Sequence, residues 1–228
     1  MGKIIIFEET TKNPITKIGE RAGYCWGADT SDPLKNYKRG MSCIKSGHGR
    51  ALEFVNCEFA LEGFSARVIR EWYTHIGGAP TRLQASTRYI NYGDNPDFVT
   101  PPSVEAAGQE AVDLYQNGMK NAFKVAAQLE DMGVPREDSA LLLPMGMTTK
   151  IVDKRNVRNL IDMSRQRMCT RAYHEYRTMF IQLISELERY SDEWNTLINM
   201  TMHPKCEELG YCPEEKSCGR MPKSKHNA

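Results

Sequence analysis

The chain has 228 residues, of which 40% are hydrophobic, and its formal net charge is +1 at pH 7. This size and composition suit one large domain or two small ones with a buried core. A net charge near zero argues against a general nucleic-acid binder, which normally carries a strong basic excess. No apolar run approaches the roughly 20 residues that cross a bilayer, and the N-terminus lacks a signal-peptide cleavage pattern. We therefore expect a cytoplasmic protein that binds neither nucleic acid nor membrane.

The first half of the chain predicts strands followed by a helix. Residues 3–7 form a short strand-like apolar run. Residues 54–61 carry apolar side chains at the odd-numbered positions, which is the pattern of a half-buried strand. A helix should follow, with Ser65 as its N-cap and Gly77-Gly78 as its stop.

The second half predicts longer helices. A turn-rich loop spans 91–102, and Ser103 should cap a long amphipathic helix over 103–132. Residues 145–152 could form a strand. Residues 153–200 are helical in pattern, with breaks expected near Thr170 and at Ser191. We expect an α+β fold, in which a single domain over 1–202 has a central, mostly antiparallel sheet flanked by long helices, and a Cys-rich tail covers 203–228.

One candidate anion site follows the Gly77-Gly78 turn. Gln84, Ser86 and Arg88 occupy alternate positions there. On an extended segment, a hydroxyl and a guanidinium two residues apart point the same way and can hold one phosphate together. Glycine also lets the backbone approach a ligand closely. The alternative interpretation is a surface loop that happens to carry an arginine.

A basic cluster lies in residues 153–177, where seven Lys and Arg side chains outnumber three acidic ones. If the helix is continuous, one face presents residues spaced by three or four positions: Asn156, Asn159, Met163, Arg167, Arg171 and His174. Apolar residues are mixed into this stretch, and buried arginines need partners or a charged ligand. The cluster therefore predicts a bound phosphate or carboxylate, and a solvated basic face is the alternative.

These segments together resemble the flavin-dependent thymidylate synthases over roughly residues 20 to 200. The hallmark of that family is Arg-His-Arg followed, about seven residues later, by Ser-x-Arg-Tyr. The matching residues here are Ser46-Gly47-His48, Leu52-Glu53, His75, Ser86-Thr87-Arg88-Tyr89, Leu143-Pro144, Asn156-Val157-Arg158-Asn159-Leu160 and Arg167 to Arg177. Thr74 and Ile76 stand where the hallmark has its two arginines, and Gln84 stands in place of a usual glutamate.

The resemblance implies reductive methylation of dUMP to dTMP. Methylenetetrahydrofolate would give the carbon, and reduced FAD would give the hydride after reduction by NADPH. Arg167 would be the catalytic cation, and the substrate dUMP would be bound by Glu71, Gln84, Ser86, Arg88 and Arg167. Residues around the flavin would be His48, Glu53, His75, Asn156 and Arg171. The family assembles as a homotetramer with its sites at subunit interfaces.

Several of these residues also have structural alternatives. His48 and His75 could be ordinary structural histidines, and Glu53 could pair with Arg50. Because the hallmark arginines are missing, two other functions stay open. One is a pyrimidine-nucleotide-binding paralogue without flavin chemistry, and the other is a flavoenzyme that adds a different one-carbon group.

The seven cysteines are an odd number in a chain without an export signal, which favours free thiols or a metal site over disulfides. Cys57 and Cys169 are expected to be small buried hydrophobic residues. In the tail, His203, Cys206, Cys212 and Cys218 could form a tetrahedral zinc site. Free thiols in a flexible tail are the favoured interpretation, because paired Cys-x-x-Cys motifs are absent from the tail.

Overall fold

The computed structural model describes residues 2–93 and 96–223, and the chain divides into two compact units. One unit, called unit 1 here, comprises residues 1–3, 61–74 and 82–152. The other, unit 2, comprises residues 4–60, 75–81 and 153–228.

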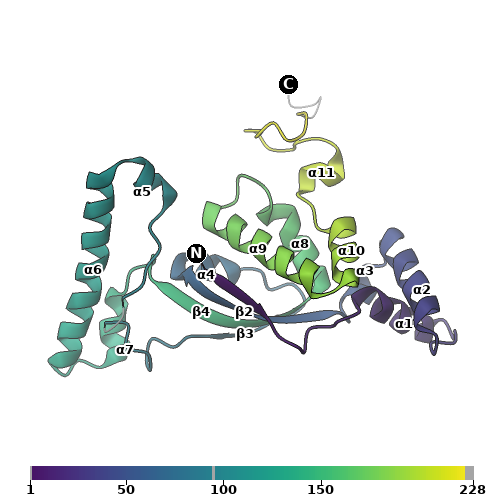
Figure 1. Ribbon diagram of the computed structural model, residues 1–228, viewed down its shortest axis with the longest axis horizontal. Coiled ribbons are helices and arrows are strands. Elements are labelled where there is room, and N and C mark those ends of the chain that lie inside the picture. The colour runs from purple at the N-terminus through teal and green to yellow at the C-terminus, as the bar shows by residue number, and fades with distance from the viewer. Residues whose placement is uncertain (1, 94–95, 224–228) are drawn as a thin grey trace. The chain divides into compact units, whose positions relative to one another are not determined.

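The strands form a single antiparallel sheet, which confirms the predicted α+β class. Its members are β1 (Lys3–Ile6), β2 (Asn56–Ser65), β3 (Thr81–Gln84) and β4 (Thr148–Asn156), in the order β1-β2-β4-β3 (Figure 1). The predicted strand 54–61 is shifted, since β2 begins at Asn56 and continues to Ser65. Cys57, Phe59 and Leu61 are fully buried as the alternation predicts, but Ala60, which was expected on the opposite face, is buried too.

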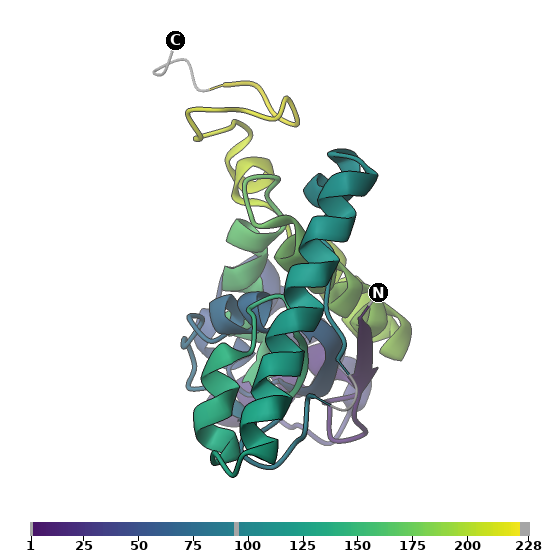
Figure 2. The same ribbon diagram turned by 90° about the vertical axis from the view of Figure 1, so that its left-hand side faces the viewer.

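Unit 1 contains one long helix and several short ones: α4 (Ala66–Trp72), α5 (Pro102–Ala106), α6 (Gln109–Asp131), α7 (Arg136–Ser139) and the 3-10 turn η1 (Ala140–Leu142). Helix α6 packs beside α7 (Figure 2). Ser65 caps α4 as predicted, since its Oγ accepts a hydrogen bond of 3.2 Å from the Val68 N–H. Helix α4 ends at Trp72, before the predicted Gly77-Gly78 stop.

The predicted helix over 103–132 is wrong as a single element. Gly108 has φ 101°, a backbone conformation that interrupts a helix, and it separates α5 from α6. Ser103 lies inside α5, whose N-cap position is Pro101, so the predicted cap is also wrong. The core of this unit forms where Met119 and Phe123 of α6 pack with Met147.

Unit 2 contains the remaining helices: α1 (Pro14–Cys25), α2 (Pro33–Lys45), α3 (Gly49–Leu52), α8 (Val157–Arg167), α9 (His174–Tyr190), α10 (Asp192–Thr201) and α11 (Lys205–Leu209). Helices α1 and α2 pack closely because Gly19 and Gly40 face the neighbouring backbone, where a Cβ would overlap the carbonyl oxygens of Asn36 and Ile15.

The interpretation of 153–200 as helical needs one correction and is otherwise confirmed. Residues 153–156 complete β4, and helix α8 begins at Val157. The break near Thr170 separates α8 from α9, and Ser191 caps α10 by accepting a hydrogen bond of 3.2 Å from the Trp194 N–H. Among residues 2–93 and 96–223, no helix has the length and apolar content that a bilayer crossing requires.

Candidate active site

The candidate residues fall into both units. Unit 1 carries the residues implied for the nucleotide: Glu71, Gln84, Ser86 and Arg88. Unit 2 carries Arg167 and the residues implied for the flavin: His48, Glu53, His75, Asn156 and Arg171.

Arg167 is the last residue of α8, and its guanidinium is held by two aromatic side chains. Its Nε donates a hydrogen bond of 2.9 Å to Nε2 of His75. Its Cζ lies 4.4 Å from the ring centroid of Tyr176, a fully buried residue of α9. A cation over an aromatic face is attracted by the ring quadrupole. The rings of His75 and Tyr176 meet edge to face at 6.0 Å, so the three side chains form one assembly.

His75 acts in this assembly as a neutral hydrogen-bond acceptor. Burial lowers the pKa of His75 to about 4, and the positive charges of Arg167 and Arg155 act in the same direction. A neutral imidazole has one ring nitrogen without a proton, which is what the Arg167 N–H requires. The imidazole therefore orients the guanidinium without cancelling its charge.

The turn after His75 runs along α8. Gly77 is close to Asn159, since a Cβ at Gly77 would lie 3.0 Å from Asn159 Nδ2. Gly78 has φ 73°, and a Cβ there would overlap Asn156 Nδ2. Asn156 caps α8 by accepting a hydrogen bond of 2.9 Å from the Asn159 N–H. The two glycines thus allow the backbone to approach the first turn of α8, while His75 reaches its last residue.

Part of the basic cluster has an internal partner. The guanidinium of Arg155 makes two hydrogen bonds to the Asp153 carboxylate, of 2.7 and 2.6 Å, and both side chains are fully buried. Its Nη1 donates to Asn159 Oδ1 at 2.6 Å. Arg155 is therefore a buried arginine of this stretch that is paired within the chain. The continuous helical face is also wrong beyond Arg167, because Arg171 lies between α8 and α9.

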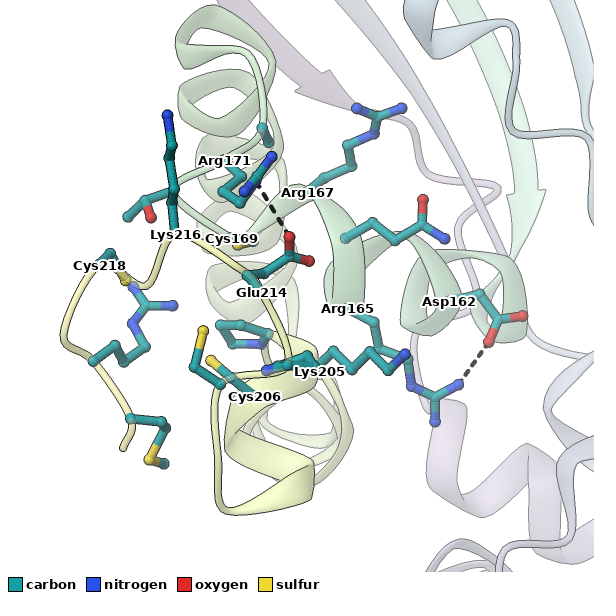
Figure 3. A pocket seen from close by; sticks show the side chains of 18 residues that line it. Asp162, Arg165, Arg167, Cys169, Arg171, Lys205, Cys206, Glu214, Lys216 and Cys218 are labelled. Carbon is teal, nitrogen blue, oxygen red and sulfur yellow. Dashed lines mark hydrogen bonds and ion pairs between the residues drawn. The ribbon is translucent and has the colours of Figure 1, made fainter. Parts of the chain in front are cut away.

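A cavity of about 630 Å³ lies in unit 2, where the residues after α8 face the tail (Figure 3). Its basic lining residues, Arg165, Arg167, Arg171, Lys205, Lys216 and Arg220, outnumber the acidic Asp162 and Glu214. Arg171 pairs with Glu214 at 3.2 Å, and both side chains are exposed. This excess of cationic side chains fits an anionic group such as a phosphate or carboxylate.

The other residues implied for the flavin lie elsewhere in unit 2. His48 is exposed and meets Trp26 edge to face at 6.5 Å. Glu53 pairs with Arg158 at 2.6 Å, and not with Arg50, which was the structural alternative to a role at the flavin.

The predicted zinc ligands do not form one group. His203 lines a separate cavity of about 350 Å³, together with His48, and its Nδ1 lies 3.6 Å from Glu207. Within the described ranges, no three His, Cys, Asp or Glu side chains already stand as a metal-holding group. Cys169 is only partly buried and lines the larger cavity, which corrects its expected burial. Cys57 is fully buried as expected, and burial raises the pKa of its thiol.

The nucleotide residues of unit 1 differ from the expected extended arrangement. Strand β3 ends at Gln84, and a turn follows in which Ser86 Oγ accepts a hydrogen bond of 3.2 Å from the Arg88 N–H. The Arg88 guanidinium pairs with Glu137 at 2.8 Å, and both side chains are exposed. Glu71 pairs with Arg67 at 3.5 Å. Ser86 and Arg88 are therefore adjacent, but through a turn rather than along one strand face.

The sequence reasoning gave no role to Tyr176 or Asp153. The sequence did contain a hint for Tyr176, which lies two residues after His174 in a segment with a helical pattern. It also contained one for Asp153, because Asp153 and Arg155 occupy alternate positions at the end of a strand-like segment.

Comparison with known proteins places the chain in a family. Residues 9–191 match the family described as thymidylate synthase complementing protein. The flavin-dependent thymidylate synthase of Nitratidesulfovibrio vulgaris is 30% identical over 209 residues, which cover 86% of this chain and 82% of that protein. The enzyme of the same name from Clostridium tetani is 26% identical and covers 99% of this chain and 96% of its own length. That of Geobacter sulfurreducens is 29% identical, with 96% and 94% covered. With the match spanning most of its length, the chain belongs to the flavin-dependent thymidylate synthase family.

Proposed function

We propose that this protein is a flavin-dependent thymidylate synthase that converts dUMP to dTMP. Methylenetetrahydrofolate is the carbon donor, FAD is the cofactor and NADPH is the reductant. The observation that carries the proposal is the assembly of Arg167, His75 and Tyr176, since the sequence resemblance matches Arg167 to the family's substrate-binding arginine.

Arg167 is the catalytic cation in this proposal. For C5 of uracil to act as the nucleophile towards the one-carbon unit, the pyrimidine ring must carry enolate-like electron density, which is shared with its carbonyl oxygens. A guanidinium fixed beforehand stabilises that charge without reorganising during the reaction. The hydrogen bond from Arg167 to neutral His75 and the Tyr176 ring restrict the guanidinium, so its charge stays directed at one place.

Ser86 and Arg88 bind the phosphate of dUMP, with Glu71 and Gln84 contacting the rest of the nucleotide. The Arg88 guanidinium is exposed and already engages a carboxylate, Glu137, at 2.8 Å. A phosphate can replace that carboxylate, since an exposed ion pair is weak. The Ser86 hydroxyl supplies a second hydrogen bond to the same group.

The residues of unit 2 fit a flavin nucleotide by their chemistry. Arg165 and Arg171, which line the 630 Å³ cavity from α8 and the segment that follows it, suit a diphosphate, although Thr74 and Ile76 replace the two hallmark arginines. Asn156, His48 and Glu53 supply amide, imidazole and carboxylate groups for further contacts. When bound, the flavin supplies the hydride chemistry, and the protein supplies binding and orientation. In a cytoplasmic homotetramer, basic residues of a neighbouring subunit would add to these.

The test is oxidation of NADPH by the purified full-length protein, with dUMP and methylenetetrahydrofolate added singly and together. Turnover that requires both, in a preparation that retains flavin, is the expected result. A preparation that binds dUMP but holds no flavin would favour the second candidate, a nucleotide-binding paralogue without flavin chemistry. That candidate is kept because Thr74 and Ile76 replace the two hallmark arginines. Flavin-dependent turnover with another one-carbon product would favour the third candidate, a flavoenzyme that adds a different one-carbon group.

A further inference from the structure

Four cysteines from three segments of unit 2 line the same cavity. Cys169 follows α8, Cys206 lies in α11, and Cys212 and Cys218 lie in the tail. Figure 3 shows the thiols of Cys169, Cys206 and Cys218 around one space. Cys169 is 37 positions from Cys206 in sequence, so its spacing did not suggest membership of this group.

The four thiols differ in exposure. Cys206 and Cys212 are buried, Cys169 is partly buried and Cys218 is exposed.

The tail also carries ion pairs at its surface. Arg165 pairs with Glu208 at 2.9 Å, Arg171 with Glu214 at 3.2 Å and Arg220 with Glu207 at 3.7 Å. Exposed pairs contribute little to stability. The tail has one short helix, α11, and one isolated bridge between Cys212 and Lys223. A stronger link is needed if a segment of this composition is to stay ordered.

We propose that Cys169, Cys206, Cys212 and Cys218 bind one zinc ion in a closed, structural site. Zinc takes four thiolates in tetrahedral geometry, and each thiol releases its proton on binding. A zinc ion with four thiolates carries two net negative charges. Lys205, Lys216 and Arg220 line the same cavity and compensate that charge.

Metal binding must draw these thiols together, because in the described residues they do not yet form a metal-holding group. His203 is excluded as a ligand, since it lines the separate 350 Å³ cavity.

The first experiment is metal analysis of the full-length protein produced with zinc in the medium. One zinc per chain is expected for the wild type. After dialysis, Cys169→Ser and Cys206→Ser should each contain at least tenfold less zinc than the wild type. His203→Ala and Cys25→Ser are matched controls that should keep it, because Cys25 is an exposed thiol outside the cavity. A wild type without zinc overturns the proposal, as does a zinc content lost in His203→Ala and kept in Cys169→Ser.

A second measurement covers the case in which a serine variant fails to fold. Zinc in the wild-type protein is exchanged for cobalt, and the absorption spectrum reports the ligands. Intense thiolate-to-cobalt bands of a tetrahedral four-sulfur site are expected. A spectrum without them, or a disulfide among the four cysteines in the mass of the intact protein, contradicts the proposal. Neither readout depends on flavin or turnover, so failure here leaves the proposed function untouched.

Discussion

At the scale of single residues, the strongest feature is the position of the Arg167 guanidinium between two aromatic side chains. Arg167 donates a hydrogen bond of 2.9 Å to His75, and its Cζ lies 4.4 Å from the ring centroid of Tyr176. Because burial keeps His75 neutral, this hydrogen bond orients the guanidinium without adding a second charge. Arg155, in contrast, is fully buried and makes two hydrogen bonds to the Asp153 carboxylate.

The first prediction is that Arg167→Ala removes turnover while the fold is retained. Loss of one preorganised electrostatic group typically costs on the order of 10²- to 10³-fold in kcat. The measurement is kcat for dUMP turnover together with the melting temperature. Arg189→Ala is the control, because Arg189 pairs with Glu186 at the exposed end of α9 and should keep full activity. Near wild-type kcat in Arg167→Ala would remove Arg167 from the mechanism.

The second prediction concerns pH and His75. The folded-state pKa of about 4 lies below the ordinary value of 6.5, so the unfolded chain binds a proton that the folded chain excludes. The contribution of His75 to the free energy of unfolding is therefore fully present above pH ~6.5 and is lost as the pH falls toward ~4. This decrease in the free energy of unfolding should reach about 2 kcal/mol, after allowance for the partial exposure of the ring.

The measurement is urea unfolding between pH 7.5 and ~4.5, where the free energy of unfolding should decrease with falling pH. His75→Gln keeps an acceptor for Arg167 but cannot titrate. This variant should show a shallower decrease over the same interval. An identical pH dependence in both proteins would show that another group is responsible.

The third prediction is that Arg88 binds phosphate. Arg88→Ala should weaken dUMP binding by roughly ten- to a hundredfold, because a charge-assisted contact of about 1.5 to 3 kcal/mol is lost. Arg88→Lys should restore only part of it, since an ammonium lacks the two-pronged geometry of a guanidinium. Glu137→Gln should instead tighten binding by a few-fold, because it removes the competing carboxylate.

Calorimetry with dUMP and with deoxyuridine provides the comparison. The penalty should be present for dUMP and nearly absent for deoxyuridine, which has no phosphate. If Arg88→Ala instead strips flavin and leaves dUMP affinity unchanged, the assignment of this segment to the nucleotide is wrong.

At the scale of elements, the turn containing Gly77 and Gly78 follows His75 and packs against the first turn of α8. The fourth prediction is that Gly78→Ala destabilises the protein by about 1 to 3 kcal/mol. An alanine there meets both the unfavourable φ of 73° and an overlap with Asn156. Gly27→Ala is the matched control, because Gly27 has φ 66° but nothing within 4 Å of the added Cβ.

Urea unfolding measures both variants, and Gly78→Ala should cost more than Gly27→Ala. Adding Asn156→Ala to Gly78→Ala should recover the part caused by overlap, although the cap of α8 is then lost. Equal costs at the two glycines would show that the approach to α8 carries no energetic weight.

Local signals in the sequence predicted the elements better than the contacts between them. Ser65 and Ser191 were recognisable caps, and both accept the hydrogen bonds that define them. Asp153 and Arg155 were wrongly predicted to belong to a basic helix. Charged residues are rarely buried unless they are paired, and here the two residues pair with each other inside a strand. Helices α1 and α2 were not predicted, and their pairing depends on two glycines that meet only in the folded chain.

The site was predictable by type rather than by arrangement. Arg167 and His75 were both candidates, but 92 positions separate them and spacing could not bring them together. Ser86 and Arg88 were expected on one strand face and are joined by a turn instead. Long-range pairing depends on the tertiary fold, which local periodicity does not encode.

At the scale of the whole molecule, the resemblance to the family predicts a homotetramer. Several large apolar side chains are exposed on the isolated chain, including Tyr24, Leu83, Tyr89 and Leu141. Exposed apolar surface of this kind is expected where subunits meet. Native mass spectrometry should therefore give a species of four chains, each of 26.0 kDa. A stable monomer that turns over dUMP would show that one chain holds a complete site.

The most direct test of the central claim is the mass of the nucleotide made from dUMP. The full-length protein is incubated with dUMP, methylenetetrahydrofolate, FAD and NADPH, and the nucleotide is analysed by mass spectrometry beside the Arg167→Ala variant. We predict a product heavier than dUMP by one CH₂ group, identical to dTMP, from the wild type, and almost none from the variant. Unchanged dUMP, or a nucleotide carrying a different one-carbon group, would contradict the claim that this chain is a thymidylate synthase.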